Sequence, residues 1–224
     1  MNRYVFDIES LKTADEVGGW INKHRMGISV LCMKDYDSGE DFVFSDQYKG
    51  ALPLSDLYNF TVGNTLIGYN INSFDWRLLL EQFKRDKMDI LIPVNLLDMK
   101  LYRCSLGGLS QATFNTDKLM SGALAPTEWR KGGSHRDKVV EYCIDDVKKT
   151  AELLTYGLEN KFVYHIDKKG IKSTVKVEWE TKLNAEPVIQ YPVCYGGYRI
   201  KKKSYQCGRC AFVGFCKKKT KDES

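Results

Sequence analysis

The sequence contains no apolar run that approaches the ~18 to 20 residues of a membrane-spanning helix. It also has no basic flank followed by an apolar core at its start, so we expect neither a signal peptide nor a transmembrane helix. We therefore expect a cytoplasmic protein. Internal repeats are absent, and low complexity is confined to a lysine-rich end at residues 217–221. With 224 residues, 43% of them hydrophobic, the chain can form one large domain, or one domain and a small appendage.

The sequence shows no sign of a disulfide framework. Its seven cysteines are odd in number, and in a reducing compartment they favour metal ligation or buried thiols. Four of them lie toward the C-terminal end, at Cys194, Cys207, Cys210 and Cys216. The two-residue gap between Cys207 and Cys210 suits one tetrahedral metal centre or one iron–sulfur cluster. We therefore predict that these four cysteines hold either Zn²⁺ or a 4Fe–4S cluster.

Most of the chain has no excess of positive charge. Residues 1–194 contain 25 Lys or Arg and 27 Asp or Glu, whereas residues 195–224 contain nine and two. Aromatic residues are interspersed among the cations of this second segment, a combination that single-strand binders use. A solvated basic end whose aromatic residues pack around a metal is the alternative. The cations predicted to contact nucleic acid are Arg199, Lys201, Lys202, Lys203 and Arg209.

Two carboxylates end the first apolar segment of the chain. Tyr4, Val5 and Phe6 favour a strand, and Asp7 and Glu9 follow two positions apart. In a strand, residues i and i+2 point to the same face. Two carboxylates on one face can share a hard cation, which indicates Mg²⁺ or Mn²⁺. A polar strand end at the edge of a sheet is the plainer alternative.

Periodicity and turn residues predict an alternating α/β chain. Strands are expected at 27–34, 41–45 and 66–69, with a Pro-containing connector or edge strand at 90–97. Helices are expected at 55–60, 72–83 and 106–114, the second of them capped by Asn72 or Ser73. A loop is expected at 122–133. Residues 15–25 are expected to form either a weak helix or a loop. A hairpin is expected from strands at 162–167 and 174–179.

Two further carboxylates follow strand ends. Asp75 falls in the first turn of the helix expected at 72–83, just beyond the strand at 66–69. A carboxylate there also stabilises the helix dipole, so its position alone does not identify a metal ligand. Asp98 follows an apolar run in a similar way, and we interpret it as a structural residue at a strand end.

The strongest helix signal covers residues 135–158. Apolar residues recur there at spacings of three and four, which gives one apolar stripe. Tyr142 and Asp146 are four positions apart and therefore lie on one face of this helix. Asp145, three positions from Tyr142, competes for the same role.

Three segments together resemble the exonuclease motifs of the DEDD superfamily, in its tyrosine-bearing branch. They are FDIE at 6–9, IGYNINSFD at 67–75 and YCIDD at 142–146. The similarity is to the proofreading domain of family B DNA polymerases and covers about residues 3–160. It implies that metal ions are held by Asp7, Glu9, Asp75 and Asp146, with Tyr142 as an aromatic helper that orients the attacking water. It also implies nucleic-acid binding by Asn70 and Phe74.

The resemblance implies an RNase H-like α/β fold, with a mixed five-stranded sheet and flanking helices. The implied activity is 3′→5′ exonuclease cleavage at single-stranded DNA ends with two Mg²⁺ or Mn²⁺ ions. About 60 residues follow the region of similarity, too few for a polymerase palm and fingers, so we expect a stand-alone nuclease or a subunit that contacts a replication or repair protein. An exoribonuclease and a catalytically idle nucleic-acid-binding or scaffold subunit are the alternatives. We expect a nuclease domain at 1–160, a β-hairpin extension at 161–185 and a cysteine-rich basic module at 186–224.

Overall fold

Six strands form one mixed sheet in the order β3-β2-β1-β4-β5-β8. The computed structural model describes residues 1–116, 120–167 and 169–190. The strands of the sheet are β1 (Arg3–Ser10), β2 (Ile28–Asp35), β3 (Asp41–Phe44), β4 (Thr65–Gly68), β5 (Pro93–Asp98) and β8 (Val188–Ile189). The central strand β1 is antiparallel to β2 and parallel to β4. Its pairing with β4 ends at Val5, so Asp7 and Glu9 lie beyond the end of β4.

The expected count of five strands is wrong by one. The additional strand is β8, which pairs antiparallel with β5 through Val188 opposite Val94. The Gln190 side chain extends this contact by donating a hydrogen bond to the Val94 carbonyl oxygen at 3.0 Å. β5 is therefore covered on both edges, and the Pro-containing segment expected at an edge lies inside the sheet.

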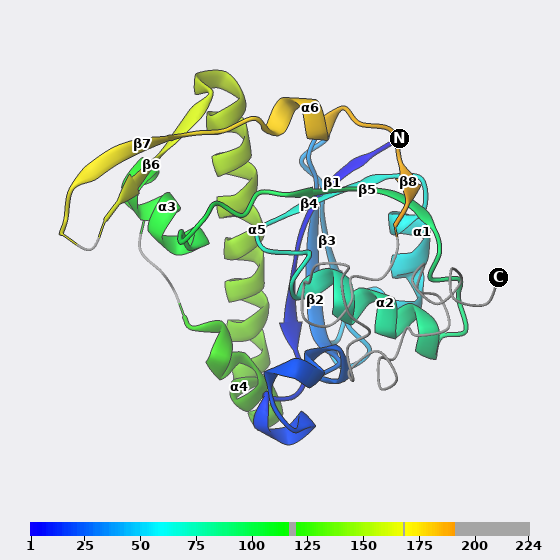
Figure 1. Cartoon of the computed structure of the whole chain (residues 1–224). Coiled ribbons are helices and arrows are strands. Elements are labelled where there is room, and N and C mark those ends of the chain that lie inside the picture. Colours follow the sequence, from blue (N-terminus) through cyan, green and yellow to red (C-terminus); the bar gives the residue numbers. More distant parts are fainter. Residues whose placement is uncertain (117–119, 168, 191–224) are drawn as a thin grey trace, which may run out of the picture.

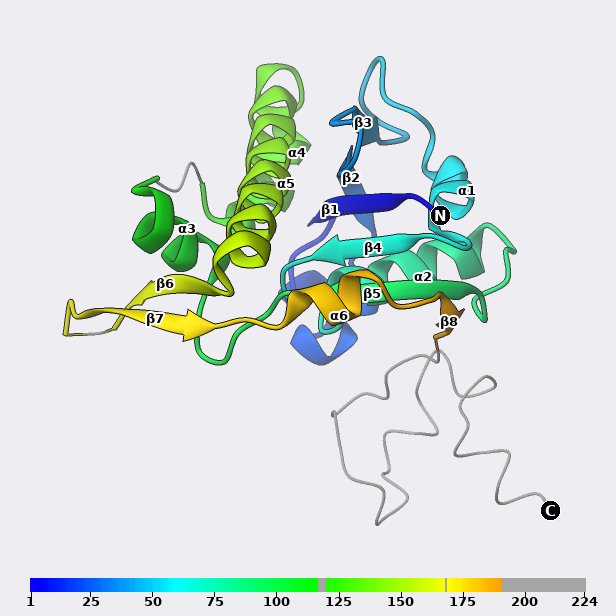
Figure 2. The ribbon, with the colours of Figure 1, turned by 90° about the horizontal axis from the view of Figure 1, so that it is seen from above.

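Helices cover both faces of this sheet (Figure 1). The α-helices are α1 (Leu57–Thr61), α2 (Asp75–Arg85), α3 (Leu106–Phe114), α4 (Ala125–Lys131), α5 (Ser134–Asn160) and α6 (Trp179–Leu183). The 3₁₀ helices of the described residues are η1 (Asp15–Val17), η2 (Trp20–Arg25), η3 (Leu54–Asp56) and η4 (Gly122–Leu124). A separate ribbon of β6 (Phe162–Ile166) and β7 (Lys172–Lys176) projects beside α3, as Figure 2 shows from above. No helix in these described ranges is long and apolar enough to cross a membrane.

Alternation along β1 divides the core into two layers. Phe6 and Ile8 pack into the cluster on the α2 side, together with the buried Trp76 and Phe83 of that helix. Val5 packs into the other cluster, with apolar residues of α3, α4 and α5. The faces alternate because successive side chains of a strand point to opposite sides. Asp7 and Glu9 share the face of Val5 and are therefore directed toward α5.

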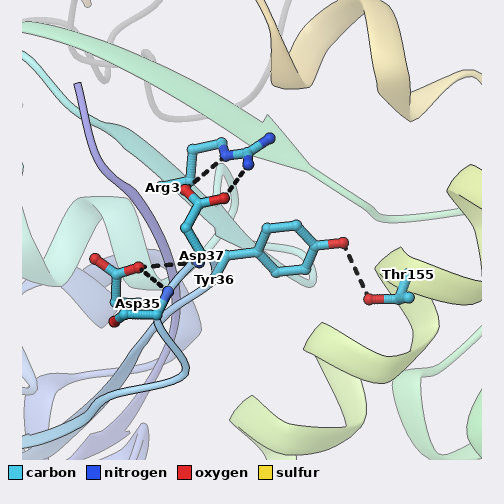
Figure 3. A network of polar contacts seen from close by, with 6 residues as sticks. Arg3, Asp35, Tyr36, Asp37 and Thr155 are labelled. Carbon is cyan, nitrogen blue, oxygen red and sulfur yellow. Dashed lines mark hydrogen bonds and ion pairs between the residues drawn. The ribbon is translucent and has the colours of Figure 1, made fainter.

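The long helix α5 confirms the strongest helix signal of the sequence. A hydrogen bond near its C-terminal end connects it to the sheet. Tyr36, just after β2, hydrogen bonds through its hydroxyl to the Thr155 hydroxyl at 3.0 Å (Figure 3). Arg3 of β1 forms an ion pair with Asp37 in the same turn. The Asp35 carboxylate accepts a hydrogen bond from the Asp37 main-chain N–H at 2.9 Å, which fixes the turn.

Three local expectations are wrong. The loop expected at 122–133 contains α4, which forms because Trp129 is fully buried and Pro126 is tolerated in a first helical turn. The N-cap of α2 is Phe74 and not Asn72 or Ser73, and no side chain caps it. The second hairpin strand ends at Lys176, and Trp179 instead begins α6.

The connection from β4 to α2 is held tightly, and it places Asp75. The Asp98 carboxylate, at the end of β5, accepts hydrogen bonds from the main-chain N–H groups of Asn70 at 2.8 Å and Asn72 at 3.1 Å. A Cβ atom at Gly68 would lie only 2.4 Å from Ile71 Cγ2 and 2.9 Å from the Phe6 carbonyl oxygen. The interpretation of Asp98 as a structural residue fits these contacts.

We predict that Gly68→Ala lowers the thermal unfolding midpoint, because the added methyl group meets a main-chain oxygen that cannot move freely. Overpacking of this kind costs about 1 to 3 kcal/mol. Asn72→Ala is the matched control, since the Asn72 side chain is exposed and only its main-chain N–H is held by Asp98. Equal midpoints for both variants, measured by circular dichroism, would show that the loop is not closely packed on β1.

Candidate metal centre

Three carboxylates converge where β1 passes α5. Asp7 and Glu9 come from one face of β1, and Asp146 comes from α5. One ligand oxygen from each of the three lies within 4.8 Å of the others. Glu9 is buried, while Asp7 and Asp146 are half-buried. The structure thus brings together residues 137 positions apart that the sequence predicted to share a cation.

Asp75, the fourth predicted ligand, lies beside this trio and is not among the three groups that meet within 4.8 Å. It is the first residue of α2, is buried, and accepts a hydrogen bond from the Ile8 main-chain N–H at 3.1 Å. Ile8 lies between Asp7 and Glu9 in β1, so this bond places the Asp75 carboxylate next to the strand. Burial raises the pKa of Asp75 to about 7, and the charges of Asp98 and Asp146 add to the shift.

The electrostatics of the cluster oppose full ionisation. Burial raises the pKa of Asp7 well above its ordinary value, and the charges of Asp75 and Asp146 raise it further. The pKa of Glu9 is raised in the same way, first by burial and then by Asp7 and Asp146. Like charges at such separations cannot all ionise without a compensating cation. A bound divalent cation would remove this penalty.

Tyr142 lies on the same face of α5 as Asp146, one helical turn earlier. Burial together with the Asp146 charge raises the pKa of Tyr142 above its ordinary value of 10.0. The hydroxyl is therefore protonated at neutral pH and is available as a hydrogen-bond donor. Gly122 faces the same space, because a Cβ atom there would lie 3.7 Å from the Tyr142 hydroxyl oxygen and 3.8 Å from Glu9 Oε2.

The structure distinguishes the two neighbouring aspartates of α5. Asp145 forms an ion pair with Lys149, at 2.5 Å between Oδ2 and Nζ, and the Lys149 side chain is only 5% exposed. Asp146 is the one that joins the Asp7 and Glu9 carboxylates. The competing assignment to Asp145 therefore has less support.

Sequence reasoning missed a thiol that touches the cluster. Cys143, which the periodicity placed in the apolar stripe, directs its Sγ to the Asp7 carbonyl oxygen at 3.4 Å and to Asp7 Oδ2 at 3.8 Å. Burial and contact with the Cys32 thiol raise the pKa of Cys143, so it is a protonated donor. Its position next to Tyr142 on the helix is the only sequence signal that could have indicated this contact.

The remaining predicted binding residues are less fully described. Phe74 is half-buried and stacks on Trp20. Asn70 has a left-handed backbone, with φ of 67°, and is held by Asp98 through its N–H. The predicted metal-binding cysteines and the predicted basic contacts lie outside the described residues. They are Cys194, Cys207, Cys210, Cys216, Arg199, Lys201, Lys202, Lys203 and Arg209.

No protein-family model matches the chain, and no curated protein matches it. Among solved structures, the chain is similar to the family B DNA polymerase from the hyperthermophilic archaeon Pyrobaculum calidifontis, with a TM-score of 0.55 and 18% sequence identity. The similarity covers 70% of this chain but 24% of the polymerase. At this identity the likeness is one of fold. The mixed sheet flanked by helices is compatible with the RNase H-like architecture expected from the sequence and is shared with part of a DNA polymerase.

Proposed function

We propose that this chain is a metal-dependent 3′→5′ exonuclease that hydrolyses phosphodiester bonds at single-stranded DNA ends. The observation that carries the proposal is the convergence of Asp7, Glu9 and Asp146, whose ligand oxygens lie within 4.8 Å of one another. The order of the three motifs and the likeness to part of a DNA polymerase support a nucleic-acid substrate. We propose DNA rather than RNA as the substrate because the similar solved structure is a DNA polymerase.

The donor set fits hard divalent cations. All ligand groups of the trio are carboxylate oxygens, which suit Mg²⁺ or Mn²⁺. Asp7 faces both Asp75 and Asp146, whose charges raise its pKa, so it is the residue that two ions would share. When bound, two such ions stabilise the attacking and leaving oxygens of an in-line phosphoryl displacement.

The chain's own residues hold and orient the reactants. Asp7, Glu9, Asp75 and Asp146 would hold the cations. The neutral Tyr142 hydroxyl has lone pairs that can accept a hydrogen bond from the attacking water. Gly122 leaves the space between Tyr142 and Glu9 clear for that water.

Two parts of the proposal concern substrate choice and the C-terminal segment. Labelled single-stranded DNA and RNA, assayed side by side with Mn²⁺ and with EDTA, separate the deoxyribonuclease from an exoribonuclease. No cleavage of either strand would favour an idle binding or scaffold subunit. We also propose that the cysteines from Cys194 to Cys216 hold zinc or an iron–sulfur cluster; absorption in the visible range distinguishes the two.

We predict that Asp7→Asn raises the thermal midpoint of the metal-free protein, and more at about pH 8 than near pH 4. The pKa of Asp7 is raised in the folded state, so its ionised form costs stability that is absent below the ordinary value of 3.8 and grows as pH rises. Added Mn²⁺ should stabilise the wild-type protein more than the variant. Differential scanning fluorimetry measures both effects, and a midpoint unaffected by Mn²⁺ in the wild type would contradict the metal centre.

We predict that Asp146→Asn and Asp145→Asn have different consequences. Loss of the ligand Asp146 should lower the cleavage rate by more than about 100-fold, since changes beyond the ligands already cost about 10- to 100-fold. Asp145→Asn should retain the rate but lower the thermal midpoint, because it removes the ion pair between Asp145 and the buried Lys149. Rates are compared below both midpoints. A larger loss of rate in Asp145→Asn than in Asp146→Asn would show that Asp145, and not Asp146, is the ligand of the third motif.

We predict that Tyr142→Phe slows cleavage by about 10- to 100-fold, because it removes the hydroxyl proposed to orient the attacking water while keeping the buried ring. Mn²⁺ affinity, measured by calorimetry, should change far less than the rate. A wild-type rate for this variant would make Tyr142 a packing residue only.

A further inference from the structure

One tryptophan is exposed, and it lies outside the metal centre. The sequence has four tryptophans, all within the described residues: Trp76, Trp129 and Trp179 are at most 5% exposed, whereas Trp20 is 58% exposed. Trp20 begins η2, a 3₁₀ helix in a segment expected to be a weak helix or loop. A large aromatic side chain kept in solvent calls for an explanation, because its burial would stabilise the fold.

Trp20 adjoins the proposed active site. Its ring stacks on Phe74, with centroids 5.5 Å apart and planes only 4° from parallel. Phe74 directly precedes Asp75, whose carboxylate is bonded to the Ile8 N–H of β1. The stacked pair therefore lies at the start of α2, directly before Asp75.

Cations gather around the same element. Lys23 Nζ lies 5.2 Å from the centroid of the Trp20 ring. The pKa of Lys23 is lowered by burial and by the charge of Arg77, which is two residues after Asp75 in α2. Burial and neighbouring positive charges lower the pKa of His24 to about 4. The cations that act on His24 are Arg25, Arg77, Lys84 and Arg85. Positive charges crowded along the seam of η2 and α2 are complementary to an anionic chain.

We infer that Trp20 and Lys23 form a platform for a single-stranded nucleic acid, with an unpaired base packed against the exposed surface of the Trp20 indole and a backbone phosphate at Lys23. This inference rests on the proposed function of the metal centre. Aromatic faces for bases and cations for phosphates are the two parts that single-strand recognition requires. A paired base is already stacked within a duplex and does not offer its face, so the platform selects unpaired ends.

Tryptophan fluorescence tests this inference directly, because the other three tryptophans are buried. Full-length Asp7→Asn protein in EDTA is titrated with an oligothymidylate of about 12 nucleotides. Binding is followed in parallel by the anisotropy of a labelled strand. We expect quenching of Trp20 emission that saturates with the anisotropy, and much weaker quenching by an abasic strand of the same length, which keeps the phosphates but lacks the bases.

Three substitutions separate stacking from general effects. Trp20→Ala should weaken binding by about tenfold, the loss of one base–aromatic stack, and Trp20→Phe should retain most of the affinity. Met88→Ala, which removes another exposed apolar side chain just beyond α2, should have no effect. Strand binding without a change in Trp20 emission, or an unchanged affinity of Trp20→Ala, would overturn the platform while leaving the nuclease proposal intact. If the wild-type protein neither binds nor cleaves a strand, both proposals are wrong.

Discussion

Repulsion among closely spaced carboxylates is the interaction that the surrounding structure must counteract. Two of these groups receive a hydrogen bond that favours their charged form. Asp75 accepts from the Ile8 main chain, and Asp7 accepts from the Cys143 thiol. The donors lessen the penalty without removing it, since the pKa values of Asp7, Glu9 and Asp75 remain raised. Because the carboxylates repel one another in the metal-free site, binding of a cation would stabilise the folded protein.

Several elements of the fold position this site. β1 extends beyond its pairing with β4, so that Asp7 and Glu9 lie past the parallel part of the sheet. Asp98 holds the loop before α2, and α5 crosses the other side of β1 with Tyr142 and Asp146 toward the strand. Asp145, the neighbour of Asp146 on the same helix, has a separate role because it forms an ion pair with Lys149. The carboxylates are thus placed by strand pairing and helix packing, which are rigid.

The features that local pattern determines were predictable from the sequence. The strand around Asp7, the place of Asp75 in the first turn of α2 and the long helix α5 all follow from patterns within a short window. The missed features depend on distant partners: α4 is stabilised by burial of Trp129, and β8 by an edge of β5. Local spacing carries no information on either partner. The same holds for the contact of Cys143 with Asp7, which are 136 positions apart.

The alternation of β1 has a consequence for how this chain can change over evolution. Phe6 and Ile8 fill one core layer while Val5 fills the other, with the carboxylates on the face of Val5. Inserting or deleting a single residue in this strand would exchange the two faces, bury the acids among apolar side chains and turn the apolar residues toward the side that now holds the carboxylates. The strand can therefore accept exchanges of one apolar residue for another. Its length between Arg3 and Glu9 cannot change, because both core layers depend on which face each residue occupies.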